Sequence, residues 1–133
     1  MEPQDQQKLL ELLFSRADAL NGFWNLYIAV SLGALCVMVS GKPFTEVKAI
    51  KALLTTAFLA FAYSNYDVIA STNLQRVELL KLLEGSAFKA AASAAAPPSP
   101  VMLRLFHGTL DAIVVLAIWL VPWHKTIKGQ SAG

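Results

Sequence analysis

The stretch ALNGFWNLYIAVSLGALCVMVSG, residues 19–41, contains no charged side chain. Asp18 precedes it and Lys42 follows it, so the uncharged run is 23 residues long. Because a helix rises 1.5 Å per residue, about 20 residues cross a hydrocarbon core of about 30 Å. The run exceeds the apolar part of a signal peptide, about 7–15 residues, and the segment before it is no more basic than acidic. The sequence therefore predicts a first membrane span at 19–41 and no cleaved signal peptide.

The composition of the whole chain agrees with a membrane location. Apolar residues make up 56% of the 133 residues and charged residues 15%, with a mean hydropathy of +0.51. A soluble domain usually carries about 25% charged residues. The net charge is only +2, and the Lys and Arg residues are scattered, which excludes the dense basic face of a nucleic-acid-binding protein. We expect one all-α membrane domain, 1–133, with the lipid bilayer as its partner.

Two further apolar runs are each interrupted by one carboxylate. Asp67 lies in the second predicted span, 50–72, and Asp111 lies in the third, 105–123. No Pro or Gly occurs between Pro43 and Gly85, so the second helix is expected to start near Pro43 and continue beyond its span to residue 84. The sequence thus predicts three spans. Aromatic side chains near the span ends are predicted interfacial anchors: Trp24, Trp119 and Trp123.

Two leucine-rich segments lie on the same side of the predicted membrane. The sequence LLELL at 9–13 belongs to an expected amphipathic helix at 4–21, and LLKLL at 79–83 ends the second helix. We expect the first two helices to extend beyond the bilayer as a hairpin held by Leu9, Leu13, Leu79 and Leu83. The alternative is that both segments lie flat in the headgroup layer. An Ala/Pro-rich loop is expected at 86–100 and a short tail at 126–133.

The first span also carries small residues suited to close helix contact, namely Ala29 and Gly33, together with Ser31 and Ala34. The Lys and Arg residues number six on the N-terminal side of the membrane and five on the other. The short basic loop 41–51 and the tail favour a cytoplasmic C-terminus and an N-terminus outside.

The two intramembrane aspartates are the main candidates for a functional site. Antiparallel geometry puts both roughly 8–10 Å below the same membrane surface. Asp67 shares a helix face with Tyr63, and Asp111 shares one with His107, each four residues earlier. Other polar and aromatic residues are expected at this depth: Asn21, Trp24, Asn25, Tyr27, Asn65, Tyr66 and Thr109.

Three interpretations of these residues stay open. Both aspartates lie at the headgroups, or they form a structural polar cluster between helices, or they form a proton or cation site. The candidate residues of that cluster or site are Asp67, Asp111, His107, Tyr63 and Asn25. The His107–Asp111 spacing alone is too common to predict a bound metal.

Catalytic signatures are absent from the sequence. It contains no Gly-rich phosphate loop, no G-x-S-x-G and no H-E-x-x-H, so we expect a protein that is not an enzyme and needs no cofactor. Three spans bury little surface, which favours association with other membrane subunits or with copies of the same chain. The first hypothesis is a non-catalytic subunit of a larger membrane assembly. The alternatives are a homo-oligomeric channel or proton/cation-conducting unit that uses Asp67 and Asp111, and a holin-like membrane-permeabilising protein.

Overall fold

The computed structural model describes residues 2–40 and 47–120, which form four α-helices and, within those two ranges, no strand. The helices are α1 (Pro3–Val39), α2 (Lys48–Leu83), α3 (Lys89–Ser93) and α4 (Pro100–Leu120). The all-helical fold class predicted from the sequence is confirmed. Some predicted features lie outside the described residues: Gly41 at the end of the first span, the helix start near Pro43, residues 121–123 with Trp123, and the tail 126–133.

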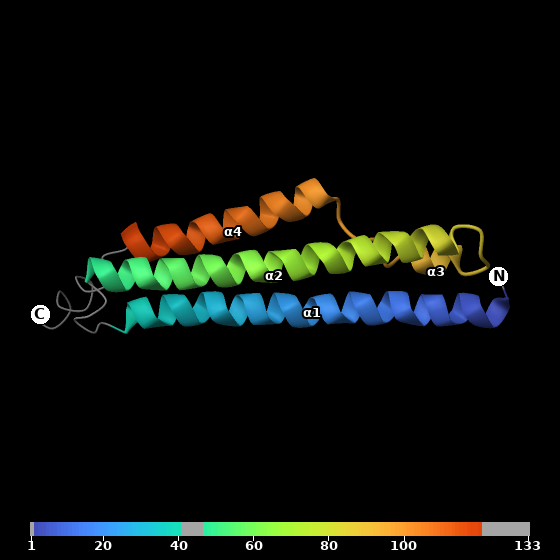
Figure 1. Cartoon of the computed structure of the whole chain (residues 1–133), viewed down its shortest axis with the longest axis horizontal. Helices are drawn as coiled ribbons and strands as arrows, with labels where there is room; N and C mark the ends of the chain where they lie inside the picture. The colour runs from blue at the N-terminus through green and yellow to red at the C-terminus, as the bar shows by residue number, and fades with distance from the viewer. Residues whose placement is uncertain (1, 41–46, 121–133) are drawn as a thin grey trace, which may run out of the picture.

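The two long helices, α1 and α2, run antiparallel side by side for almost their whole length (Figure 1). Their buried positions alternate by three and four residues, which is the pattern of a coiled coil. On α1 these positions include Leu13, Leu20, Tyr27, Ser31, Ala34 and Met38. On α2 they include Phe58, Ala62, Asn65, Ile69, Thr72, Arg76, Leu79 and Leu83. These two rows of buried side chains form the α1–α2 seam, which determines which side of each helix faces the other helix.

The end of the pair that contains the N-terminus is held by leucine. Leu13, Leu79 and Leu83 are buried in one cluster, and Leu9 packs against it. Two alanines from the segment predicted as a loop, Ala92 and Ala95, complete the cluster. The segment contains a short helix, α3, and folds back onto this end of the pair (Figure 1).

The last helix, α4, begins at Pro100, five residues before the predicted span. Proline is accepted at the first helical position, since that N–H has no partner within a helix. α4 packs on both α2 and α1. Leu103 contacts the Leu20–Ile69 cluster, and Val114 and Ile118 join the cluster around Tyr27.

Two of the described helices, α1 and α4, are long and apolar enough to cross a membrane by length and composition. α2 does not meet this criterion, which corrects the prediction of three apolar spans. Only residues 52–66 separate Lys51 from Asp67, about 22 Å of helix. Small and hydroxylated side chains, such as Thr56 and Ser64, further lower the hydropathy of this part of α2.

Candidate functional site

A hydrogen-bonded network joins α1 to α4 near the middle of the bundle. The Tyr27 hydroxyl donates to Asp111 Oδ1 at 2.7 Å. The second carboxylate oxygen, Oδ2, lies 3.1 Å from His107 Nδ1, one helical turn earlier on α4. With Asp111 as a carboxylate, which only accepts hydrogen bonds, the His107 tautomer that satisfies this contact carries its proton on Nδ1. Asp111 therefore satisfies two donors from two different helices.

His107 is enclosed by aromatic rings. Its side chain is 1% exposed, and its ring centroid lies 4.5 Å from that of Tyr27, 5.4 Å from Tyr66 and 5.7 Å from Trp24. Its second nitrogen, Nε2, is buried and has no hydrogen-bond partner within the described part of the chain. The enclosing rings come from both α1 and α2, so His107 lies where all three long helices meet.

This arrangement is suited to holding a proton or to fixing the helices relative to each other. The Asp111 carboxylate lies on one side of the imidazole, and the rings of Trp24, Tyr27 and Tyr66 surround its other sides. The neutral imidazole also satisfies Asp111 through Nδ1–H. Among residues 2–40 and 47–120, no group of three His, Cys, Asp or Glu side chains is arranged to hold a metal ion.

Three of the five candidate site residues, Tyr63, His107 and Asp111, line one open cavity of about 390 Å³, and of these His107 and Asp111 are in hydrogen-bond contact. Tyr63 is 75% exposed, and Asn25 and Asp67 are also exposed. The two aspartates differ in depth as well. Asn65 Nδ2 donates to the Phe23 carbonyl, so Asp67 lies near residue 21 of α1, whereas Asp111 lies beside Tyr27. The difference is roughly six residues, or about 9 Å along the bundle.

For three further residues the sequence predicts only their depth in the membrane. In the structure they take part in the hydrogen-bonded network or surround His107. Tyr27 supplies the donor to Asp111, while Tyr66 and Trp24 supply rings around His107. The seven-residue recurrence of Leu13, Leu20, Tyr27 and Ala34 is the signal that assigns Tyr27 to the buried face. It is weak in the sequence because a tyrosine and an alanine occupy two of its four positions.

Other predicted contact residues are placed as follows. Trp24 is half-buried and packs against Phe106 as well as His107, and the Trp119 indole N–H donates to Thr55 Oγ1 at 3.0 Å. Ala29 and Gly33 are exposed, whereas their small neighbours Ser31 and Ala34 lie in the α1–α2 seam.

The outward face of α2 differs from those of α1 and α4. A stripe of exposed small or polar residues follows its length: Ala52, Thr56, Ala60, Ser64, Asp67 and Ser71. Leu53 and Leu59 flank this α2 stripe. By contrast, the exposed residues of α4, and those of α1 after residue 25, are mostly large and apolar, for example Ile28, Leu32, Leu105, Ile113 and Leu116.

A buried cation lies between the Tyr27–Asp111–His107 network and the leucine cluster around Leu13 and Leu83. Arg76 of α2 is 7% exposed; it donates from Nη1 to Asn73 Oδ1 at 3.1 Å and from Nη2 to the carbonyl of Ala95. Burial lowers the pKa of its guanidinium, since desolvation disfavours the charged form. Arg76 thereby joins α2 to the segment that follows α3.

No protein-family model, curated protein or solved structure matches the chain.

Proposed function

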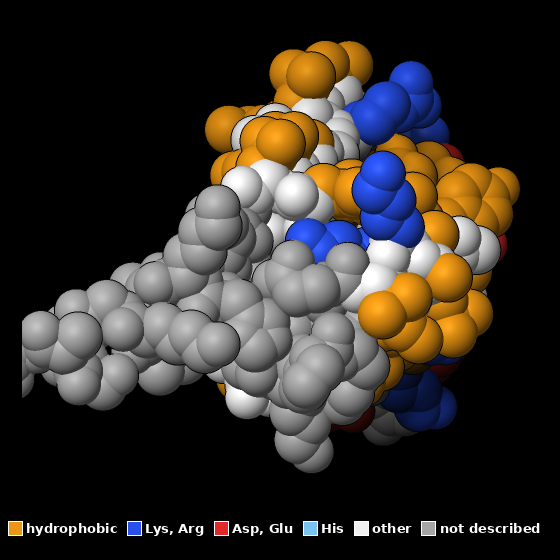
Figure 2. All heavy atoms as spheres, turned by 90° about the vertical axis from the view of Figure 1, so that its left-hand side faces the viewer, with side chains coloured by type: hydrophobic (Ala, Val, Ile, Leu, Met, Phe, Trp, Pro, Cys, Tyr) orange, Lys and Arg blue, Asp and Glu red, His pale blue; other side chains and the backbone are white. Residues whose placement is uncertain are grey.

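We propose that the protein is an integral membrane protein that acts as a non-catalytic subunit of a larger membrane assembly. The exposed apolar side chains of α1 and α4 support membrane insertion. Viewed from the end where α1 finishes and α2 begins, apolar side chains occupy much of the coloured rim of the bundle (Figure 2). In water, such a surface would carry a large hydrophobic cost, whereas lipid chains accommodate it.

The chain direction supports a third crossing by α2. α1 and α4 point the same way along the bundle, and α2 runs between them in the opposite direction (Figure 1). If α1 and α4 both cross a bilayer in one direction, the chain must return through it, and α2 is the helix that returns. Its low hydropathy then requires shelter from lipid.

The α2 stripe is the observation that carries the assembly proposal. A carboxylate facing lipid is costly, and Asp67 is exposed on the same side as Ser64 and Ser71. Small residues allow a neighbouring helix to approach closely, and hydroxyl groups can hydrogen-bond to it. We infer that a helix of another membrane protein covers the α2 stripe and supplies the polar partner of Asp67.

The test is purification of tagged protein in a mild detergent followed by native mass determination. Wild type is expected to copurify with a partner of defined stoichiometry. Ala60→Trp adds bulk in the α2 stripe and should release that partner, whereas Leu32→Trp on the lipid-facing side of α1 should leave the complex intact. A complex that survives Ala60→Trp, or a wild-type protein that is monomeric, would contradict the proposal.

A second candidate function uses the same stripe. In a homo-oligomer whose α2 helices face a common axis, Asp67, Ser64 and Thr56 would line a polar path for a proton or cation. The exposed position of Asp67 favours this candidate, whereas Asp111 is half-buried on α4, between Tyr27 and His107, and so lies away from a path along α2. A homo-oligomer of fixed size would support it, provided that Asp67→Asn abolishes ion flux after reconstitution without changing the oligomer.

A further inference from the structure

Arg76 is a buried cation that forms no ion pair with a carboxylate of the described residues. Within the described part of the chain, no Asp or Glu oxygen lies within 4.0 Å of its guanidinium, and Nε has no hydrogen-bond partner. Its two other nitrogens contact only neutral oxygens, those of Asn73 and Ala95. Burying a charge without a counter-ion is among the most costly arrangements in a protein. The arrangement therefore indicates that an anion completes it.

A cavity lined by both polar and apolar side chains opens beside Arg76. Its volume is about 310 Å³, and its lining includes Asp18, Asn21, Asn73 and Arg76. Asp18 is exposed on α1, so its carboxylate is available to a cation near the mouth of the cavity. The cavity thus presents a buried positive group and an exposed negative group that do not pair with each other. Charge complementarity calls for a ligand that carries both an anionic and a cationic group.

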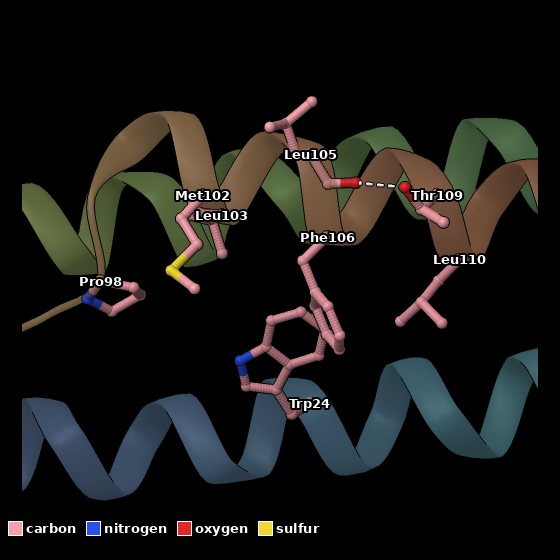
Figure 3. Close-up of a pocket in the computed structure, with 8 residues that line it drawn as sticks. All are labelled: Trp24, Pro98, Met102, Leu103, Leu105, Phe106, Thr109 and Leu110. Atoms are coloured by element: carbon pink, nitrogen blue, oxygen red, sulfur yellow. Dashed lines mark hydrogen bonds between the residues drawn. The ribbon is translucent and has the colours of Figure 1, made fainter.

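An apolar groove continues from this cavity between α1 and α4. Trp24, Pro98 and Leu103 line both spaces, which makes them adjoining. The groove has a volume of about 490 Å³, and Figure 3 shows Trp24 rising from α1 towards Met102, Phe106 and Leu110. The hydroxyl of Thr109, its one polar lining side chain besides the Trp24 indole, is occupied by a hydrogen bond to the Leu105 carbonyl. The groove is suited to a hydrocarbon chain.

The depth of the two spaces matches the two parts of a phospholipid. Arg76 lies on α2 between Ile69, which packs on Leu20, and Leu79, which packs on Leu13. This level is at the charged end of α1, before the uncharged run begins at Ala19. Trp24 and Phe106 lie beyond that boundary, inside the uncharged run. A headgroup at Arg76 would therefore lie at the membrane surface, with its chain pointing into the bilayer.

We propose that the cavity and the groove together bind one phospholipid with a phosphoethanolamine headgroup. The phosphate pairs with the Arg76 guanidinium, the primary ammonium pairs with Asp18, and one acyl chain lies in the groove beside Trp24. The proposal rests on membrane insertion, the first part of the proposed function, and is independent of the assembly partner. A phosphate headgroup is a natural ligand for a guanidinium because both carry several hydrogen-bonding groups in fixed geometry.

The test uses Trp24 as a reporter in vesicles. In the variant Trp119→Phe/Trp123→Phe, Trp24 is the one remaining tryptophan. Quenching of its fluorescence is measured in phosphatidylcholine vesicles that contain one brominated lipid at a fixed fraction: phosphatidylethanolamine, phosphatidylglycerol or phosphatidylcholine. We expect several-fold stronger quenching by the brominated phosphatidylethanolamine, and its reversal by excess unbrominated phosphatidylethanolamine. Inorganic phosphate should not reverse it.

Further substitutions in the Trp119→Phe/Trp123→Phe variant separate the contribution of the phosphate contact from that of the ammonium contact. Arg76→Gln should abolish the lipid preference, and Asp18→Asn should remove the advantage of phosphatidylethanolamine over phosphatidylglycerol. Arg16→Gln, an exposed arginine on the same end of α1, is the matched control and should change nothing. The reversal experiment needs no substitution at the site and therefore stands even if Arg76→Gln fails to fold.

Two outcomes would overturn the proposal in distinguishable ways. Equal quenching by all three brominated lipids, or a preference for phosphatidylglycerol, would mean that the chain is inserted but has no phosphoethanolamine site. Absence of quenching by any brominated lipid would mean that Trp24 is not in the bilayer, which would contradict membrane insertion itself.

Discussion

The hydroxyl of Tyr27 and the carboxylate of Asp111 are separated by 84 residues in the chain and by 2.7 Å in the structure. This bond fixes α4 against α1 at the level where α2 contributes Tyr66 and Phe58 to the same interior. A carboxylate in an apolar interior is tolerated when its oxygens are paired. Asp111 therefore connects α4 to α1. The contribution of this connection to the free energy of unfolding can be measured.

Replacing Tyr27 by Phe should destabilise the folded protein by about 1–3 kcal/mol. The ring and its packing remain, but Asp111 Oδ1 loses its donor while it stays largely buried. Denaturant unfolding in detergent, followed by circular dichroism, measures the change. Tyr63→Phe is the matched control, since that hydroxyl is on an exposed side chain, and it should have almost no effect. Equal effects of the two substitutions would refute the role of the Tyr27 hydroxyl.

The contributions of Tyr27 and His107 should be coupled through the carboxylate they share. We expect the double variant Tyr27→Phe/His107→Phe to differ from the sum of the single variants by about 0.5–3 kcal/mol, because both remove a donor from Asp111. A double-mutant cycle of unfolding free energies gives this number. Additive single effects would indicate that the two residues act independently.

The stability of the leucine cluster at the N-terminal end of α1 should depend on the leucines on only one side of α2. Leu83 is 0% exposed in the cluster with Leu13, whereas its neighbour Leu82 is 60% exposed. Leu83→Ala should cost about 2–5 kcal/mol through lost burial and the cavity left behind. Leu82→Ala should stay within about 0.5 kcal/mol, as expected for a surface substitution. Chemical unfolding of the two variants in parallel decides between this arrangement and leucine segments that lie flat in the headgroup layer.

Cysteine accessibility along α2 should locate the membrane boundary. In a Cys36→Ser background, Gln75→Cys lies beyond Asp67 on an exposed position and should react with a membrane-impermeant maleimide. Ala60→Cys is also exposed in the isolated chain but lies within the uncharged stretch 52–66, so it should be inert in vesicles. Labelling of Ala60→Cys at the same rate as Gln75→Cys would contradict a crossing by α2.

Much of the local structure follows from residue spacing. The absence of Pro and Gly between residues 43 and 85 predicts a long second helix, and α2 runs from Lys48 to Leu83. His107 and Asp111 are neighbours because residues four apart lie on one face of a helix. Each of these relationships lies within a single helix, where the backbone geometry is regular and known in advance.

The side that one helix turns towards a neighbouring helix cannot be derived from the residue spacing within either helix. Asp67 was a candidate partner of Asp111 because both interrupt apolar runs. The seam of α2 passes through Ala62, Asn65 and Ile69, so a residue two positions after Asn65 points to the opposite side of the helix. Asn65, at the correct angle, is buried in its place and bonds to the Phe23 carbonyl.

The sequence by itself determined the helical class, the approximate helix ends, the apolar and charged portions of each helix and the His107–Asp111 pair. The tertiary structure decided that Tyr27 completes this pair, that Asp67 faces outwards and that Arg76 is buried away from every carboxylate in residues 2–40 and 47–120. The physical reason is that helix periodicity is set by the backbone, whereas the choice of buried face is set by packing among three helices. That choice depends on all the side chains in the seam together, and polar and small residues here occupy positions that apolar patterning alone would not assign to the interior.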